Sequence, residues 1–161
     1  MPCVRSRTRF AIAEHIAEEE RSIVSRVNRV DGPGKTRNQV MRTAAEVIRH
    51  LSQKANLDKE ARDMASLLVF CFRRIDEGID ESVRAWEKRA YWVKAEQVRV
   101  RWGWAGPAAD RLEALIRADE WDRLPALLAE LLTHFSDITI ARFTREAAIW
   151  QGAYDRLLAE G

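Results

Sequence analysis

The sequence has little of what ends helices, separates domains or cross-links chains. Its 161 residues include seven glycines, four prolines and only two cysteines. Cys3 lies in the N-terminal tail and Cys71 in an apolar run, and two such cysteines do not form a disulfide framework. We therefore expect reduced thiols and a cytoplasmic protein.

A strong charge imbalance and a long apolar segment are also missing. The 27 lysines and arginines nearly balance 25 acidic residues, which gives a net charge of +2. No overall field therefore demands a nucleic acid or an anionic membrane. The longest apolar run, Leu67–Phe72, is far too short to span a bilayer. The basic N-terminus is followed by a glutamate-rich amphipathic segment, which argues against a secretory signal.

Recognisable catalytic motifs are absent as well. The sequence has no G-x-S-x-G, and neither cysteine has a histidine nearby in sequence. Gly34-Lys35-Thr36 matches the end of a phosphate-binding loop. However, Arg29 stands where that motif needs its first glycine, and a helix precedes it instead of a strand. We therefore favour a non-catalytic protein without a cofactor.

Apolar residues at helical spacing fill most of the chain. No segment alternates like a strand for more than a few residues. With 47% apolar residues, a chain of 161 residues can bury a core of its own. The sequence therefore predicts an all-α protein, a single domain over residues 1–161 built as an irregular bundle of about six helices.

Residues 6–55 predict a helical hairpin. Its first helix covers residues 6–30, and Asp31-Gly32-Pro33-Gly34 ends it, because proline cannot continue a helix and glycine tolerates the left-handed cap. Thr36 and Gln39 then form a capping box for the second helix. The apolar positions of the first helix are Ile12, Ile16, Ile23 and Val27.

Residues 58–104 predict one long helix, the spine of the bundle. Its apolar positions keep helical phase to Trp104, and Gly78 is the only interior weak point. Three C-terminal helices are expected within residues 107–159. They run from Pro107 to about Ala118, from Pro125 to near Phe135, and from Ser136 or Asp137 along Ile140, Phe143, Ala147, Trp150, Tyr154 and Leu157.

Two glutamates and two histidines form a candidate metal site. In an antiparallel hairpin centred on Pro33, His15 and Glu19 share one level with Glu46 and His50. Such side chains bind zinc or a redox metal, or hold a general base. The alternative is a pair of Glu–His contacts on solvated edges, and the E-x-x-H motif of di-iron bundles is absent. Glu19 interrupts the apolar stripe, so we expect its carboxylate to be buried and paired.

The far end of the long helix carries aromatic residues among cations. Tyr91, Val98 and Trp102 fall opposite Trp86, Val93 and Val100, so a single neighbour cannot cover both sets. The predicted partner interface consists of Tyr91, Val98 and Trp102 with Arg84 and Lys88. Cations beside aromatic rings also suit single-stranded nucleic acid. That alternative uses Arg84, Lys88, Arg89, Lys94, Arg99 and Arg101.

An acidic block precedes this basic block along the helix. It contains Asp76, Glu77, Asp80 and Glu81. An antiparallel second copy would set acid against base twice, which favours a homodimer, although exposed pairs contribute only about 0–1 kcal/mol each. The leading hypothesis is a helical protein-interaction or adaptor module that forms a homodimer. A nucleic-acid-binding protein is the second hypothesis, and a metal-binding bundle is the third.

Overall fold

The computed structural model describes residues 32–161, of which Pro33–Gly161 form one compact unit. In this part of the chain six α-helices and three short 3-10 helices are present, and no strand. The all-helical class predicted from the sequence is confirmed. None of the helices described is long and apolar enough to cross a membrane.

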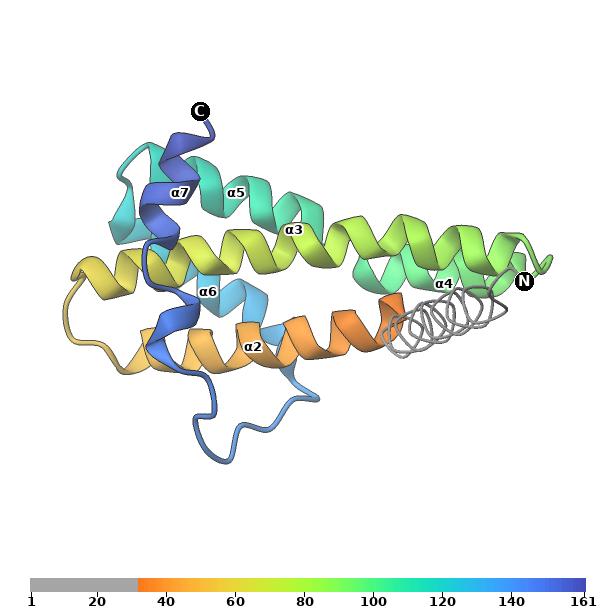
Figure 1. The fold of residues 1–161 in the computed structure, drawn as a ribbon, viewed down its shortest axis with the longest axis horizontal. Helices are drawn as coiled ribbons and strands as arrows, with labels where there is room; N and C mark the ends of the chain where they lie inside the picture. The colour runs from red at the N-terminus through yellow and green to blue at the C-terminus, as the bar shows by residue number, and fades with distance from the viewer. Residues whose placement is uncertain (1–31) are drawn as a thin grey trace, which may run out of the picture. The chain divides into compact units, whose positions relative to one another are not determined.

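Helix α3 (Lys59–Glu87) is the centre of the unit. The helices α2 (Pro33–Gln53), α4 (Trp92–Trp102), α5 (Ala105–Arg117) and α7 (Ala153–Ala159) all pack against it (Figure 1). The helix α6 (Leu124–Leu131) packs on α5 instead. The 3-10 helices are Trp121–Arg123, Leu132–Phe135 and Ala147–Ile149. A long central helix is therefore present, as predicted.

The start of α3 follows from its capping residue. Asp58 Oδ1 accepts a hydrogen bond from the backbone N–H of Ala61 at 2.8 Å, which satisfies one of the free donors of the first turn. The helix then runs through Gly78 without a break. The start of α2 differs from the prediction, because it lies at Pro33 and not at Thr36. Proline fits the first turn, where its missing N–H costs no hydrogen bond.

The long helix predicted over residues 58–104 is wrong in one respect, because the chain reverses after Glu87. Ala90 adopts a left-handed conformation with φ of 59°. The N–H of Tyr91 donates to the Trp86 carbonyl at 3.0 Å, and the N–H of Ala90 donates to the Glu87 carbonyl at 2.9 Å. These two bonds form a Schellman helix end. No glycine or proline marks the reversal, so periodicity alone predicted a continuous helix.

The helix predicted from Ser136 onward is also wrong over most of its length. Only Ala147–Ile149 and Ala153–Ala159 are helical, as a 3-10 turn and as α7. The Glu46 carboxylate accepts the backbone N–H groups of Thr144 and Arg145, and the Arg49 guanidinium donates to the carbonyl of Ile140. Side chains of α2 therefore satisfy backbone groups that a helix would pair internally.

Candidate interaction surfaces

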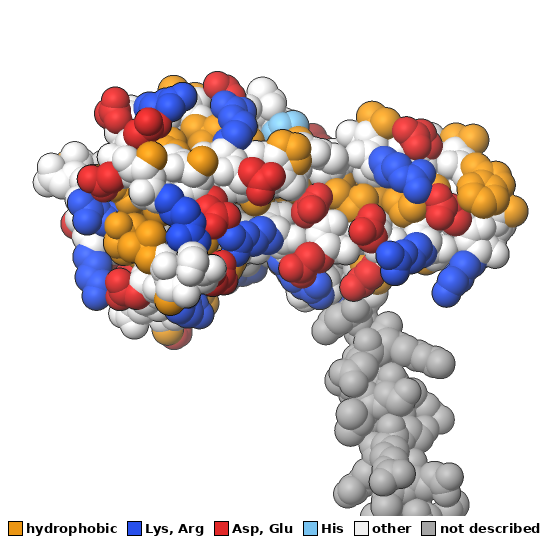
Figure 2. Space-filling view, turned by 90° about the horizontal axis from the view of Figure 1, so that it is seen from above, with side chains coloured by type: hydrophobic (Ala, Val, Ile, Leu, Met, Phe, Trp, Pro, Cys, Tyr) orange, Lys and Arg blue, Asp and Glu red, His pale blue; other side chains and the backbone are white. Residues whose placement is uncertain are grey.

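Among the residues described, the most exposed aromatic side chains lie at the tip of the α3–α4 hairpin. Tyr91, Trp92 and Val93 are 53%, 63% and 73% exposed, and we call these three residues the tip patch. Figure 2 shows apolar side chains gathered at the end of the unit that α3 and α4 form, among charged ones. Large exposed apolar patches rimmed by polar residues mark interaction sites.

The tip patch is held by contacts on its inner side. The ring of Tyr91 meets the ring of Trp86 edge-on, with centroids 5.9 Å apart, which is the apolar contact that accompanies a Schellman end. The ammonium of Lys94 lies 4.7 Å from the Trp86 ring centroid and 5.5 Å from that of Tyr91. Such cation–π contacts contribute about 0.5–1 kcal/mol each at exposed sites. The patch is therefore presented on an ordered turn.

The structure divides the predicted interface in two. Tyr91 is exposed, but Val98 and Trp102 pack on a small second core of Ile79, Val83 and Ala95. The side chains of Val93 and Val100, on the opposite side of α4, are 73% and 76% exposed instead. The reversal at Ala90 is the reason: once α4 folds back, the face that carries Ala95, Val98 and Trp102 meets α3.

The six cations predicted for nucleic-acid binding are all exposed, but they differ in their contacts. Arg99 forms ion pairs with Glu87 at 2.7 Å and Glu96 at 3.4 Å. The remaining contacts are cation–π contacts, of Arg89 and Lys94 with Trp86 and of Arg101 with Trp102. Arg84 and Lys88 have no carboxylate within ion-pair distance in residues 32–161. These two are the cations most available to a partner.

Glu46 and His50, half of the predicted metal site, hold the C-terminal segment on α2. The buried carboxylate of Glu46 accepts the backbone N–H groups of Thr144 and Arg145 at 2.5 Å and the Thr144 hydroxyl at 3.0 Å. The His50 ring stacks on Phe143 with centroids 3.6 Å apart. Burial alone would raise the pKa of Glu46, but the hydrogen bonds from Arg145 and Thr144 outweigh it and lower that pKa.

His15 and Glu19, the other half of that site, lie outside the residues described. The four-residue metal site and the burial of Glu19 therefore stay predictions. Within residues 32–161, no three His, Cys, Asp or Glu side chains are placed to hold a metal ion. The Glu46 carboxylate accepts hydrogen bonds from three donors, so in this arrangement it holds the C-terminal segment.

Cys71 and His134 are two further described residues whose side chains can act as a nucleophile or as an acid or base. Burial raises the pKa of the Cys71 thiol to about 12, which keeps it protonated and unreactive. The His134 ring stacks on Trp104 with centroids 4.2 Å apart, and burial lowers its pKa. Cys71 lies in α3, whereas His134 lies in the 3-10 helix that follows α6. Neither arrangement suggests catalysis.

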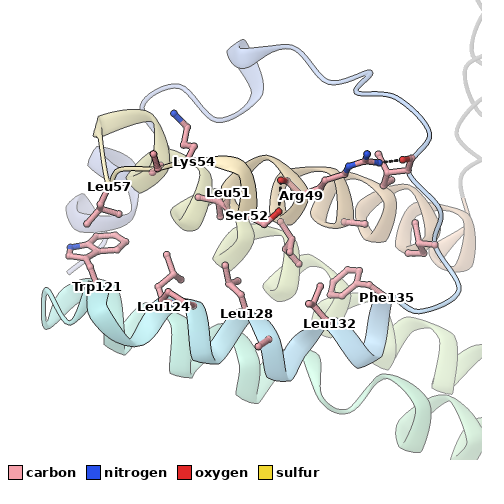
Figure 3. Close-up of a pocket in the computed structure, with 18 of the residues that line it drawn as sticks. Arg49, Leu51, Ser52, Lys54, Leu57, Trp121, Leu124, Leu128, Leu132 and Phe135 are labelled. Carbon is pink, nitrogen blue, oxygen red and sulfur yellow. Dashed lines mark hydrogen bonds between the residues drawn. The ribbon is translucent and has the colours of Figure 1, made fainter.

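A groove between α2 and α6 was not anticipated from the sequence. Its volume is about 860 Å³, and it is lined mainly by apolar side chains. Leu51 of α2 faces Leu124 and Leu128 of α6, with Trp121 near one end and Phe135 near the other (Figure 3). The signal in the sequence was the apolar character of α6 on more than one side, since Leu127 and Leu131 are buried as well.

Comparison with known proteins adds no relative. No family model matches the chain, and neither the curated proteins nor the solved structures contain a match to it. The surfaces described above are therefore the basis on which a function is proposed.

Proposed function

We propose that this chain is a non-catalytic protein-interaction module, that the tip patch is its contact surface, and that a second copy of the chain is the partner. The observation that carries the proposal is the exposure of three consecutive large side chains, Tyr91, Trp92 and Val93. Tryptophan, tyrosine and arginine dominate the binding energy of protein interfaces. Burial of apolar surface contributes about 25 cal/mol for each Å² removed from water.

The order of the hairpin supports this function. The Schellman bonds of Ala90 and Tyr91, the Trp86–Tyr91 contact and the cation–π contacts of Lys94 hold the tip before a partner arrives. A surface that is already ordered loses less conformational entropy on binding, which leaves more of the contact energy as affinity.

The charge pattern of α3 supports a second copy as the partner. Asp76, Glu77, Asp80 and Glu81 are all exposed, and the exposed Arg84 and Lys88 follow them toward the tip. In a two-fold arrangement of antiparallel α3 helices, each acidic block faces the basic block of the other copy. Electrostatic complementarity of this kind favours one register and orientation over others.

Sedimentation velocity over a wide concentration range tests the proposal. The full chain should form a dimer whose interface buries more than about 1,000 Å² in total. Trp92→Lys should give a folded monomer, because the side chain is exposed and its loss leaves the core intact. Leu158→Lys, at a 40% exposed position on α7, is the matched control and should still dimerise. A wild-type monomer at every concentration, or a dimer of Trp92→Lys, would contradict the proposal.

Nucleic-acid binding is the second candidate function. It is supported by Arg84 and Lys88, which lack ion-pair partners in the part described, beside the exposed rings of Tyr91 and Trp92. Bases stack on such rings while cations contact phosphates. Binding to a generic single-stranded oligonucleotide should then weaken steeply with salt and should be reduced in Lys88→Gln.

The free, buried thiol of Cys71 supports the cytoplasmic location that the sequence predicts.

A further inference from the structure

We propose that the groove between α2 and α6 binds an amphipathic α-helix of a partner protein, with the helix C-terminus and an acidic residue at the Arg49 end. This site lies apart from the tip patch. Its lining comes from α2, the α2–α3 loop, the first turn of α3, the 3-10 helix at Trp121, α6 and the segment after it, and none from α4. It therefore does not depend on the proposed homodimer.

The shape of the groove fits a helix. One wall is α2, with Ala45, Ile48 and Leu51, and the other is α6 with the 3-10 helix behind it, with Leu124, Leu128 and Leu132 (Figure 3). The second wall runs from Leu124 to Phe135, with eight α-helical residues and four 3-10 residues. At about 1.5 Å and about 2.0 Å per residue its length is about 20 Å, or roughly three to four turns of a bound helix. Helices that lay an apolar face into such grooves use anchors at i, i+3, i+4 and i+7.

The exposure of its rim favours a helix over an enclosed small molecule. Leu132 is 52% exposed and Leu57 is 38% exposed although both line the groove. Small-molecule sites usually enclose most of the ligand surface. An amphipathic helix buries one side only and leaves its polar side in solvent, which matches an open, apolar groove of about 860 Å³.

Charges at the two ends of the groove give the helix a direction. At one end Lys54 is shared by two carboxylates, Asp58 at 2.9 Å and Glu60 at 2.6 Å. Around Trp121 at the same end, Asp119 accepts a hydrogen bond from the indole N–H and the Arg62 guanidinium lies over the ring, so three carboxylates face two cations there.

Arg49 lies toward the other end of the groove (Figure 3) and has no carboxylate partner in residues 32–161. Its guanidinium donates to the Ile140 carbonyl and lies over the Phe143 ring. A guanidinium has five N–H donors, so others remain for a ligand.

Because a helix has a dipole, the difference in charge between the two ends of the groove favours one direction of the bound helix. The N-terminus of a helix carries a partial positive charge and suits the Asp58–Glu60 end, whereas the C-terminus carries a partial negative charge and suits Arg49. A glutamate in the last turn of the bound helix adds a charged partner for the Arg49 guanidinium.

The test uses two synthetic amphipathic peptides, each held helical by an internal lactam bridge and labelled for fluorescence anisotropy. Both have leucine at i, i+3, i+4 and i+7; one has glutamate in its last turn and the other has lysine there. The full chain should bind the glutamate peptide several-fold more tightly, and Arg49→Glu should reverse that preference. Leu132→Glu should weaken binding of the glutamate peptide at least tenfold, while Leu158→Glu, on α7 away from the groove, should leave it unchanged.

Several results would overturn the proposal. One is equal weakening of peptide binding by Leu132→Glu and Leu158→Glu. No binding of either peptide would overturn it as well. Another is saturable binding of a fluorescent fatty acid that Leu132→Glu abolishes, in a chain that binds neither peptide. The last is peptide binding that appears only when Ile16 and Ile23 are both replaced by glutamate, which would assign the groove to the chain's own residues 6–30. None of these results depends on dimerisation at the tip patch.

Discussion

The two halves of α3 have the same apolar periodicity but different surroundings. Leu68, Phe72 and Ile75 are fully buried in a large core to which α2, α5 and α6 contribute. One turn further, Ile79 and Val83 share a small second core with Ala95 of α4. Arg37 of α2 also reaches this region, where it donates to the Ser82 hydroxyl at 3.1 Å and lies over the Trp102 ring.

This difference shows that burial depends on how many neighbours a helix has as well as on its own pattern. Within residues 32–161, α4 is the helix that packs along the hairpin half, and part of the apolar surface there is exposed, as at Trp92 and Val100. Segments with few buried contacts also open more readily than the rest of a fold. The half of α3 with least support is the half at which we propose the partner surface.

Truncating two isoleucines one turn apart should give the largest contrast. Ile75→Ala removes a side chain from the large core and should cost about 4 kcal/mol of unfolding free energy, whereas Ile79→Ala in the small core should cost about 2 kcal/mol. Denaturant unfolding followed by circular dichroism measures both values. Equal costs would mean that the hairpin half is as well supported as the other.

Glu46, a buried residue of α2, holds the C-terminal segment beside the packed half of α3 by hydrogen bonds. Glu46→Gln removes the charge that accepts bonds from Thr144 and Arg145 and should cost about 2 kcal/mol at neutral pH. Because the native pKa of Glu46 is lowered, its stabilisation is complete above the ordinary pKa of 4.5 and is lost as the pH falls through the lowered value. The variant should therefore lose less stability in acid than the wild type does.

Glu130→Gln is the matched control for this prediction. Glu130 forms a single exposed ion pair with Arg111 at 2.8 Å, so its replacement should cost less than about 1 kcal/mol. A Glu46→Gln protein as stable as the Glu130→Gln protein would show that the C-terminal segment is held by its apolar contacts alone.

The smallest expected effect is a gain in stability at the hairpin turn. Ala90 holds a left-handed conformation with φ of 59°, which costs an alanine about 1–2 kcal/mol that a glycine does not lose. Part of this gain is offset by the greater freedom of glycine in the unfolded chain. Ala90→Gly should therefore stabilise the protein by about 0.5–1 kcal/mol in denaturant unfolding. Destabilisation would contradict the Schellman end.

Most of the fold was predictable from the sequence, because local signals agreed with the tertiary structure there. The Asp58 cap and Pro125 in the first turn of α6 mark real helix starts. The errors lie where a tertiary contact replaced a helical one. The Glu46 carboxylate accepts hydrogen bonds from the backbone N–H groups of residues 144 and 145. Ala90 adopts a left-handed conformation, which an alanine in the sequence does not predict.

The candidate site was only partly predictable for the same reason. The apolar periodicity correctly predicted that Tyr91, Arg84 and Lys88 are exposed. It also predicted that Val98 and Trp102 face a partner, which is wrong, because it predicted one continuous helix past Glu87. The groove depends on two helices about 70 residues apart in sequence, α2 and α6, and helical spacing carries no information about such pairs.

Hydrogen–deuterium exchange of the full chain at low and high concentration tests the tip patch as an interface most directly. Association should slow exchange of the backbone amides around residues 88–94 and leave those of the packed half of α3, residues 64–75, unchanged. Trp92→Lys should abolish the concentration dependence. Exchange around the tip that is the same at all concentrations, or protection that appears elsewhere, would contradict the assignment of this surface.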